Sequence, residues 1–146
     1  MCIRDRAWSE CSARLEQAGH VADAVGATQA LGDICIVQGR LQDGLGRYQE
    51  SLELVPEQSR SLVRGTADMH VGMSEVFLER LDLAMAKEHL QEAQELGEYA
   101  GMAKFPYRWR VATARVRAVE GDLDLSLIHI SARRKRSPPS ARARTK

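Results

Sequence analysis

The chain has 146 residues, of which 44% are hydrophobic, 5% aromatic and 28% charged. This length suits one domain with its own core and is too short for two ordinary domains. Four prolines and eleven glycines are too few for a low-complexity chain, and no apolar run is long enough to span a bilayer. Because Cys2, Cys11 and Cys35 show neither a paired spacing nor a zinc pattern, we expect a reduced, cytoplasmic protein.

The net charge of +1 averages two unlike regions. Residues 131–146 contain seven Lys or Arg and no acidic residue, whereas residues 7–124 carry twelve basic and nineteen acidic side chains. An acidic body with a basic tail is typical of an arm that binds nucleic acid or a membrane surface. Nucleic-acid binding through the tail is therefore one functional hypothesis.

The two ends of the chain share an unusual feature. Residues 1–6 and residues 125–130 can be encoded by one DNA string, CTGTCTCTTATACACAT, read in opposite orientations. That string resembles the transposase mosaic-end adapter of shotgun sequencing libraries, and such scars are excluded from fold reasoning. We therefore expect residues 1–6 and 125–146 to be adapter or chimeric sequence, the latter a disordered basic tail, and residues 7–124 to be part of a longer protein.

The interior is predicted to be helical throughout, because apolar residues recur at spacings of three and four and no stretch alternates with period two. Residues 7–24 are expected to hold the second helix of an earlier repeat, interrupted at Gly19-His20. The next helix ends at Gly39. Another begins near Gln42 and stops at Pro56, because proline lacks the amide hydrogen and clashes with the preceding turn.

The second half of the interior repeats this organisation after a predicted loop at residues 59–65. Three helices are expected there, at residues 66–80, 83–99 and 107–119. Gly101 ends the second of these helices and Pro106 precedes the third.

The breaks between paired helices recur at spacings of 42 and 40 residues: Gly39-Arg40-Leu41, Leu81-Asp82-Leu83 and Gly121-Asp122-Leu123. A small, a large and another small residue follow at fixed offsets, first as Gly44, Tyr48 and Ser51 and then as Ala86, Leu90 and Ala93. Small residues let antiparallel helices approach closely, and the larger side chain fills the gap between repeats. Repeats of this length predict an α-solenoid.

Residues of the first unit fall at the signature offsets of a known helical repeat: Leu31-Gly32, Cys35, Gly39, Gly44, Tyr48, Ser51 and Pro56. The unit closely resembles a tetratricopeptide repeat (TPR), with Gly44 and Ser51 in place of the usual alanines. The second unit fits less fully, because it is longer and lacks the closing proline. The resemblance implies an all-α, TPR-like α-solenoid of antiparallel helix pairs in a right-handed superhelix, truncated at both ends. Amphipathic helices of an ordinary bundle are the alternative.

Longer runs add a second resemblance. They lie at residues 67–76, 79–83, 95–98, 107–112 and 120–124. These runs are similar to the helical-repeat region of large bacterial LuxR-type transcriptional regulators, those related to the maltose-regulon activator. The resemblance implies an inducer-binding region that controls self-association, placed between a nucleotide-binding ATPase domain and a helix-turn-helix domain. The chain contains no G-x-x-x-x-G-K-[ST] loop, and its interior is too acidic for a DNA-binding face.

No catalytic or metal-binding pattern stands out. His20, His70 and His89 are scattered, and only His70 lies near carboxylates such as Asp68 and Glu75. Metal sites on helices use ligands at i, i+3 or i+4 on one face, and His70 with Ser74, or Glu88 with Glu92, does not meet that requirement. Cys11 and Cys35 lack a neighbouring base and suit buried apolar roles. We therefore expect a protein that is not an enzyme and that holds no cofactor and no metal.

The run Tyr107-Arg108-Trp109-Arg110 is the most distinctive cluster. One interpretation is a recognition patch, because aromatic and Arg side chains dominate binding hot spots. The favoured interpretation is structural: Trp109 packs between repeats, while Arg108 and Arg110 pair with acids such as Glu79 or Glu98.

If the repeats align, the concave side is lined by first-helix positions, with a balance that suits a polar or basic ligand. The candidate groove residues are Gln29, Asp33, Glu75, Glu79 and Arg115. The sequence thus predicts a non-catalytic segment of a LuxR-family regulator that couples inducer binding to self-association. The alternative is a general TPR scaffold that binds a peptide. The expected partner is a protein or a small-molecule inducer; DNA would be bound through a missing C-terminal domain, and no membrane partner is expected.

Overall fold

The computed structural model describes residues 3–97 and 99–121. Within this part the chain is all helical and contains no strand, which confirms the predicted all-α class. The elements are α1 (Ile3–Gln17), α2 (Val21–Val37), α3 (Leu41–Glu53), the 3-10 helix η1 (Glu57–Ser59), α4 (Thr66–Glu79), α5 (Leu83–Leu96) and α6 (Phe105–Val119).

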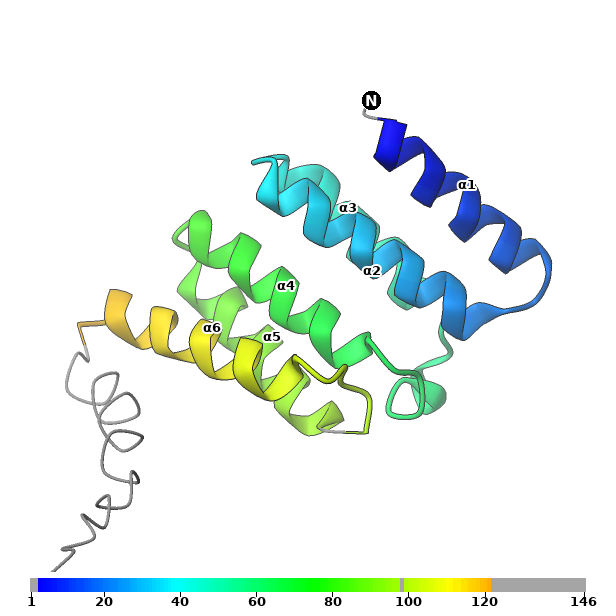
Figure 1. Cartoon of the computed structure of the whole chain (residues 1–146). Coiled ribbons are helices and arrows are strands. Elements are labelled where there is room, and N and C mark those ends of the chain that lie inside the picture. The colour runs from blue at the N-terminus through cyan, green and yellow to red at the C-terminus, as the bar shows by residue number, and fades with distance from the viewer. Residues whose placement is uncertain (1–2, 98, 122–146) are drawn as a thin grey trace, which may run out of the picture.

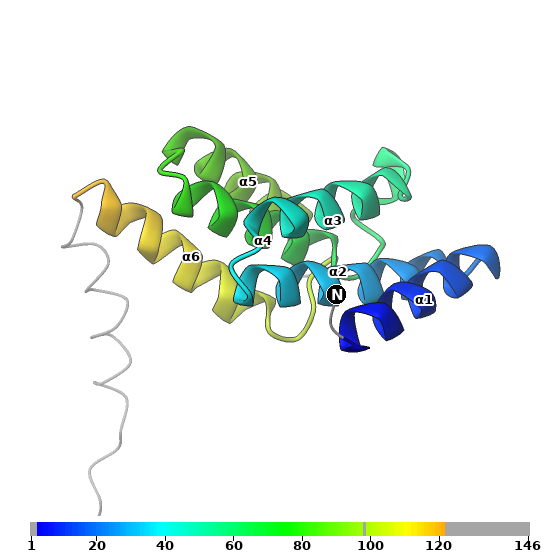
Figure 2. The ribbon, with the colours of Figure 1, turned by 90° about the horizontal axis from the view of Figure 1, so that it is seen from above.

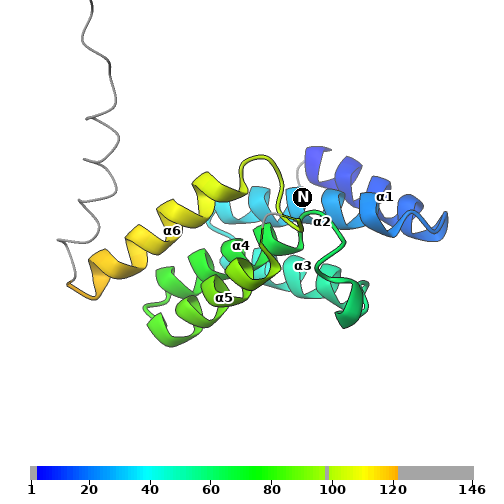
Figure 3. The same cartoon turned by 90° about the horizontal axis from the view of Figure 1, so that it is seen from below.

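The helices form antiparallel pairs that stack side by side, as a TPR-like solenoid requires (Figure 1). The pairs are α2 with α3 and α4 with α5, and α1 packs on α2 at one end. Figures 2 and 3 show α3 and α5 on the side away from α2 and α6. Because α4 contacts both α2 and α6, the first helices of successive repeats form one continuous face. We call this surface of α2, α4 and α6 the first-helix face.

The turn inside each pair requires a residue in the left-handed region. Gly39 has φ +75° and Gly121 has φ +86°, values that glycine adopts without steric cost. At the equivalent turn between α4 and α5 the residue is Leu81, with φ +60°. Asp82 then caps α5, because its carboxylate accepts a hydrogen bond from the Met85 amide at 3.1 Å.

Tyr48 joins the first repeat to the second. Its side chain is fully buried, and its ring lies against Gly32 of α2 and Gly72 of α4, where a Cβ atom would overlap the ring. Glycine at both positions therefore lets the two helices close on the aromatic ring. Around it lies an apolar cluster that includes Val25 and Met73.

Some helix boundaries differ from the predictions. The predicted helix at 83–99 ends at Leu96, because Gly97 takes φ +65° and leaves the helical region. The last helix begins at Phe105 rather than at residue 107, since Pro106 fits the first turn, where its missing N–H is not needed.

The expectations for the chain ends stay predictions. Helix α1 starts at Ile3, inside the N-terminal hexapeptide. Residues 125–146, predicted to be foreign sequence, lie outside the described residues.

Candidate functional site

Arg108 connects three helices on the first-helix face. Its guanidinium Nη2 lies 2.9 Å from Asp33 Oδ1 of α2 and 2.8 Å from Glu75 Oε2 of α4. The three side chains are 20%, 39% and 19% exposed, respectively. The structure therefore brings together two predicted groove residues, and α6 supplies the charge that binds them. Partly buried, charge-assisted bonds of this kind are stronger than exposed ion pairs.

This cluster extends inward through Tyr48, whose hydroxyl donates a hydrogen bond to Asp33 Oδ1 at 2.5 Å. Burial, together with the Asp33 charge, raises the pKa of Tyr48 above its usual value, so the phenol stays protonated as a donor. Burial alone would lower the pKa of Arg108, but the carboxylates of Asp33 and Glu75 hold that pKa above its usual value. Arg108 is thus charged near neutral pH and lies within hydrogen-bond distance of both carboxylates.

Asp68 reinforces the same region from the start of α4. Its carboxylate is 2% exposed and accepts a hydrogen bond from the Met102 amide at 2.7 Å. Burial raises the pKa of Asp68, and the bond to Met102 and the Arg108 charge oppose that rise. Asp68 thereby fixes the segment that leads into α6, which positions Arg108.

The remaining groove candidates separate into two environments. Glu79 of α4 and Arg115 of α6 form an ion pair of 2.6 Å, and each side chain is about half exposed at 49% and 47%. Gln29 is buried and packs against Gly65 rather than facing a groove. Sequence offsets thus located first-helix positions but could not distinguish an exposed position from one covered by the loop before α4.

Two residues of this cluster, Tyr48 and Arg108, are not among the predicted groove residues. The prediction that Arg108 pairs with acidic side chains is confirmed, but its partners in the structure are Asp33 and Glu75 rather than Glu79. Glu98 lies outside the described residues. The only sequence signal for Arg108 was the distinctive aromatic–arginine run on α6. Trp109 does pack between helices, because its indole N–H donates to the Leu90 carbonyl at 3.0 Å.

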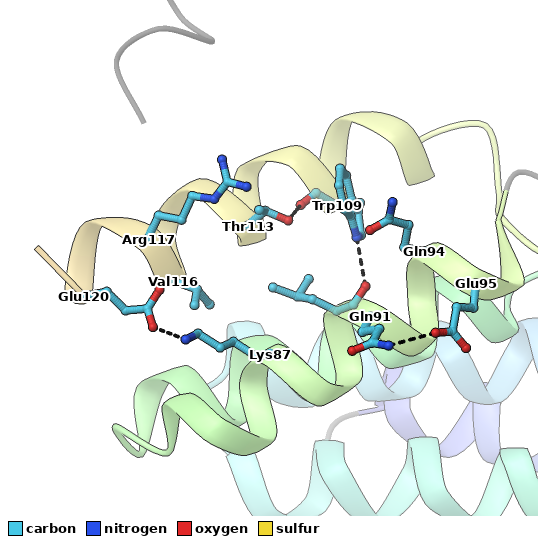
Figure 4. Close-up of a pocket in the computed structure, with 10 residues that line it drawn as sticks. Lys87, Gln91, Gln94, Glu95, Trp109, Thr113, Val116, Arg117 and Glu120 are labelled. Carbon is cyan, nitrogen blue, oxygen red and sulfur yellow. Dashed lines mark hydrogen bonds and ion pairs between the residues drawn. The ribbon is translucent and has the colours of Figure 1, made fainter. Parts of the chain in front are cut away.

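A cavity of about 650 Å³ lies between α5 and α6 (Figure 4). Several of its polar side chains are bonded to one another. Lys87 of α5 pairs with Glu120, at the end of α6, across the cavity, and Gln91 donates to Glu95 within α5 at 2.9 Å. These interactions leave the cavity mixed in polarity, with Trp109 as its single aromatic wall.

Two histidines, the buried His70 and the half-buried His89, lie together between α4 and α5. The Nδ1 atoms of His70 and His89 are 3.2 Å apart, and the His89 ring stacks on Phe77. Burial lowers the pKa of His70 to about 4 and also lowers that of His89, so both rings are neutral at pH 7. One imidazole N–H can then donate to the other ring, which explains the contact without a metal.

Metal and membrane chemistry find no support in the described residues. In residues 3–97 and 99–121, no group of three or more His, Cys, Asp or Glu side chains could hold a metal ion. None of the helices in these ranges has the length and apolar character needed to cross a membrane.

Comparison with known proteins identifies the family of the repeats. A family model described as the MalT-like TPR region matches residues 2–134. No curated protein and no solved structure matches the chain. The family model covers most of the sequence, and its helical repeats agree with the stacked pairs and turns described above. The chain therefore belongs to the family of MalT-like TPR regions.

Proposed function

We propose that this MalT-like TPR region is a non-catalytic, cytoplasmic binding segment of a LuxR-type transcriptional regulator. In this proposal it binds a protein or small-molecule inducer and couples that binding to self-association of a longer chain. DNA binding and any nucleotide binding would belong to other domains of that chain.

The observation that carries the proposal is the bridge from Asp33 through Arg108 to Glu75. It connects the first helices of successive repeats, so this guanidinium contributes to the angle between repeats together with the packing around Tyr48. A ligand that engages this face in one repeat arrangement better than in another shifts the population toward the favoured arrangement. Self-association responds if the two arrangements expose different surfaces.

Sedimentation velocity of the full chain over a range of concentrations tests this coupling. Arg108→Ala removes the bridge, and we expect it to change the association constant at least threefold. Arg115→Ala is the matched control, because it breaks an exposed pair between α4 and α6, two of the three helices that the bridge connects. Equal association constants for wild type and Arg108→Ala would argue against coupling through this face.

A general TPR scaffold that binds a peptide on the first-helix face is the second candidate. Sequencing the native gene on both sides of codons 7–124 separates the two candidates. A downstream helix-turn-helix supports the regulator, whereas a chain that ends in a capping helix supports the scaffold. The same reads test the ends, because native codons in place of the two hexapeptides would identify them as adapter. If the genome carries the hexapeptides and the basic tail, nucleic-acid binding becomes the leading function instead.

A further inference from the structure

One surface of α6 is open, although the equivalent surface of α4 is covered by α5. In α4, Ala67 and Val71 are buried in one apolar cluster with residues of α5. Forty residues later, the same repeat positions on α6 hold Tyr107 and Val111, which are 71% and 39% exposed. In the described part of the chain, α6 contacts α4 and α5 and no further helix. We call this surface the α6 outer face; it consists of Tyr107, Arg110, Val111, Ala114, Arg117 and Ala118.

The cavity of about 650 Å³ beside α6 lacks a helix in the same place (Figure 4). Its walls come from α5 and α6, with Glu120 at the end of α6. The pair α1 and α2 is equivalent to α5 and α6, because each is a second helix followed by the first helix of the next repeat. The cavity beside α1 and α2 is also lined by α3 and is smaller, at about 390 Å³. A third helix would therefore complete the α5–α6 cavity.

Helix α1 carries the residue pattern of a second helix. The small, large and small residues that α3 and α5 share recur on α1 as Cys11, Leu15 and Ala18. On α5 these positions are buried in the cluster with α4. On α1, Cys11 and Ala18 are exposed and Leu15 is half-buried, and Trp8, one turn earlier, is 39% exposed. We call these four residues the α1 stripe; in the described ranges no first helix covers it.

We propose that the α6 outer face binds α1 of a second copy of this chain, in the way that α4 binds α5. The inference rests on the self-association in the proposed function and names the two surfaces that meet. Leu15 of one copy would lie against Ala114 of the other, because the equivalent large residue Tyr48 lies against Gly32. Contact would bury the apolar part of both surfaces, which is favourable.

The second copy is the occupant because its α1 stripe has the same offsets as the helices that cover α2 and α4. The two surfaces lie at opposite ends of the described stack, as Figure 1 shows for α1 and α6. Such a contact is heterologous, so each copy that is added presents a new α6 outer face. We therefore expect the repeats to stack head to tail, and association to continue beyond a dimer.

Disulfide trapping in the full chain tests this geometry. A Cβ built at Gly44 lies 3.5 Å from the Cβ of Cys35, a separation that suits a disulfide. Cys11 and Arg117 occupy the equivalent positions on α1 and α6. Arg117→Cys, in a background with Cys2→Ser, should therefore link to Cys11 of a second copy in a glutathione redox buffer. Because α1 and α6 of one chain are not in contact, we expect a ladder of dimers, trimers and larger species on a non-reducing gel.

Two variants control for random linkage. Tyr99→Cys in the same background is matched for access, because Tyr99 is 88% exposed and lies between α5 and α6 but outside the α6 outer face. It should give no more linked protein than Cys2→Ser alone. Arg117→Cys combined with Cys11→Ser should also give no ladder, since the thiol on α1 is then missing.

Sedimentation velocity measures the association without a cross-link. Val111→Asp should weaken self-association about tenfold or more, because it places a charge in an apolar contact. Leu62→Asp is the control, since Leu62 is 79% exposed in the loop before α4 and belongs to neither surface. It should leave association unchanged, and thermal melts establish that both variants are folded.

A linked dimer without larger species would contradict head-to-tail stacking. Absence of linked species above the Tyr99→Cys control, together with unchanged association of Val111→Asp, would overturn the proposal and assign the α6 outer face to another occupant, either residues 122–146 of the same chain or a peptide. The coupling through Arg108 fails separately: if Arg108→Ala leaves association unchanged, the ladder should still form. Association that responds to Arg108→Ala but gives no ladder would overturn only the present inference.

Discussion

The two complete helix pairs, α2–α3 and α4–α5, share one frame but fill it differently. At the interface between pairs, the first repeat places Tyr48 against glycines, whereas the second places Leu90 at the equivalent position. Thr28 and Arg47 of the first repeat occupy the positions that His70 and His89 occupy in the second repeat. The repeat frame therefore depends on side-chain size at a few buried positions, and neighbouring positions can hold residues of different chemical type.

The largest expected effect comes from the glycines around Tyr48. Gly32→Ala places a Cβ within the ring of a side chain that is fully buried, and we expect a loss of about 3 kcal/mol in the free energy of unfolding. Gly26→Ala is the control in the same helix, because no atom lies within 4 Å of its added Cβ. It should stabilise by about 0.5–1 kcal/mol. Urea denaturation measures both, and equal effects would contradict the close approach.

The histidine pair should make stability depend on pH. Because burial lowers the pKa of His70 to about 4, the unfolded chain binds a proton near pH 6.5 that the folded chain rejects. Stability is then unaffected above pH 6.5 and declines as pH falls toward 4, by about 2 kcal/mol between pH 7 and pH 5.

His70→Thr introduces the residue of the first repeat and should reduce this slope. Urea denaturation at pH 7 and pH 5 compares the variant with wild type. The same decline in both proteins would assign the pH dependence to other groups.

Loss of the Arg108 bridge should cost less, because its carboxylates are partly exposed. We expect Arg108→Ala to destabilise by about 1.5 kcal/mol, since it leaves Asp33 and Glu75 without a cation. Arg115→Ala should cost below about 1 kcal/mol, as exposed pairs do. Thermal unfolding of both variants measures the two losses of stability. A larger loss in Arg115→Ala than in Arg108→Ala would contradict the expected order.

The smallest effect concerns the turns. Leu81 is 75% exposed and lies at φ +60°, where the other pairs have glycine. Leu81→Gly should therefore stabilise by about 1 kcal/mol or less, because it removes the left-handed strain and little packing. Gly39→Leu should destabilise by a similar amount. If urea denaturation showed instead that Leu81→Gly destabilises and Gly39→Leu stabilises, the exposed leucine would make a stabilising contact.

Much of the fold was predictable because it depends on local signals. Helix spacing, the turns at Gly39 and Leu81, and the stop at Pro56 are encoded within one or two turns of chain. The TPR-like repeat followed from the repeat offsets, and the resemblance to MalT-like regions followed from the longer runs. Boundaries at Leu96 and Phe105 were misplaced, because they depend on backbone angles at Gly97 and on a proline that either precedes or opens a helix.

The site was predictable only in part, because its bonds connect residues far apart in sequence. Asp33 and Glu75 were identified by equivalent offsets, but the cation between them lies 33 residues beyond Glu75. Gln29 occupies a first-helix position yet is covered by the segment around Gly65.

The most direct test of the central claim measures whether Arg108 sets the arrangement of the repeats. Spin labels at Val37 and Val119, which end α2 and α6 and are 88% and 50% exposed, report the distance across the first-helix face by pulsed electron resonance. The background carries Cys2→Ser and Cys11→Ser and keeps the buried Cys35. The account predicts one narrow distribution that broadens or shifts in Arg108→Ala and not in Arg115→Ala. An unchanged distribution in a folded Arg108→Ala variant would contradict it.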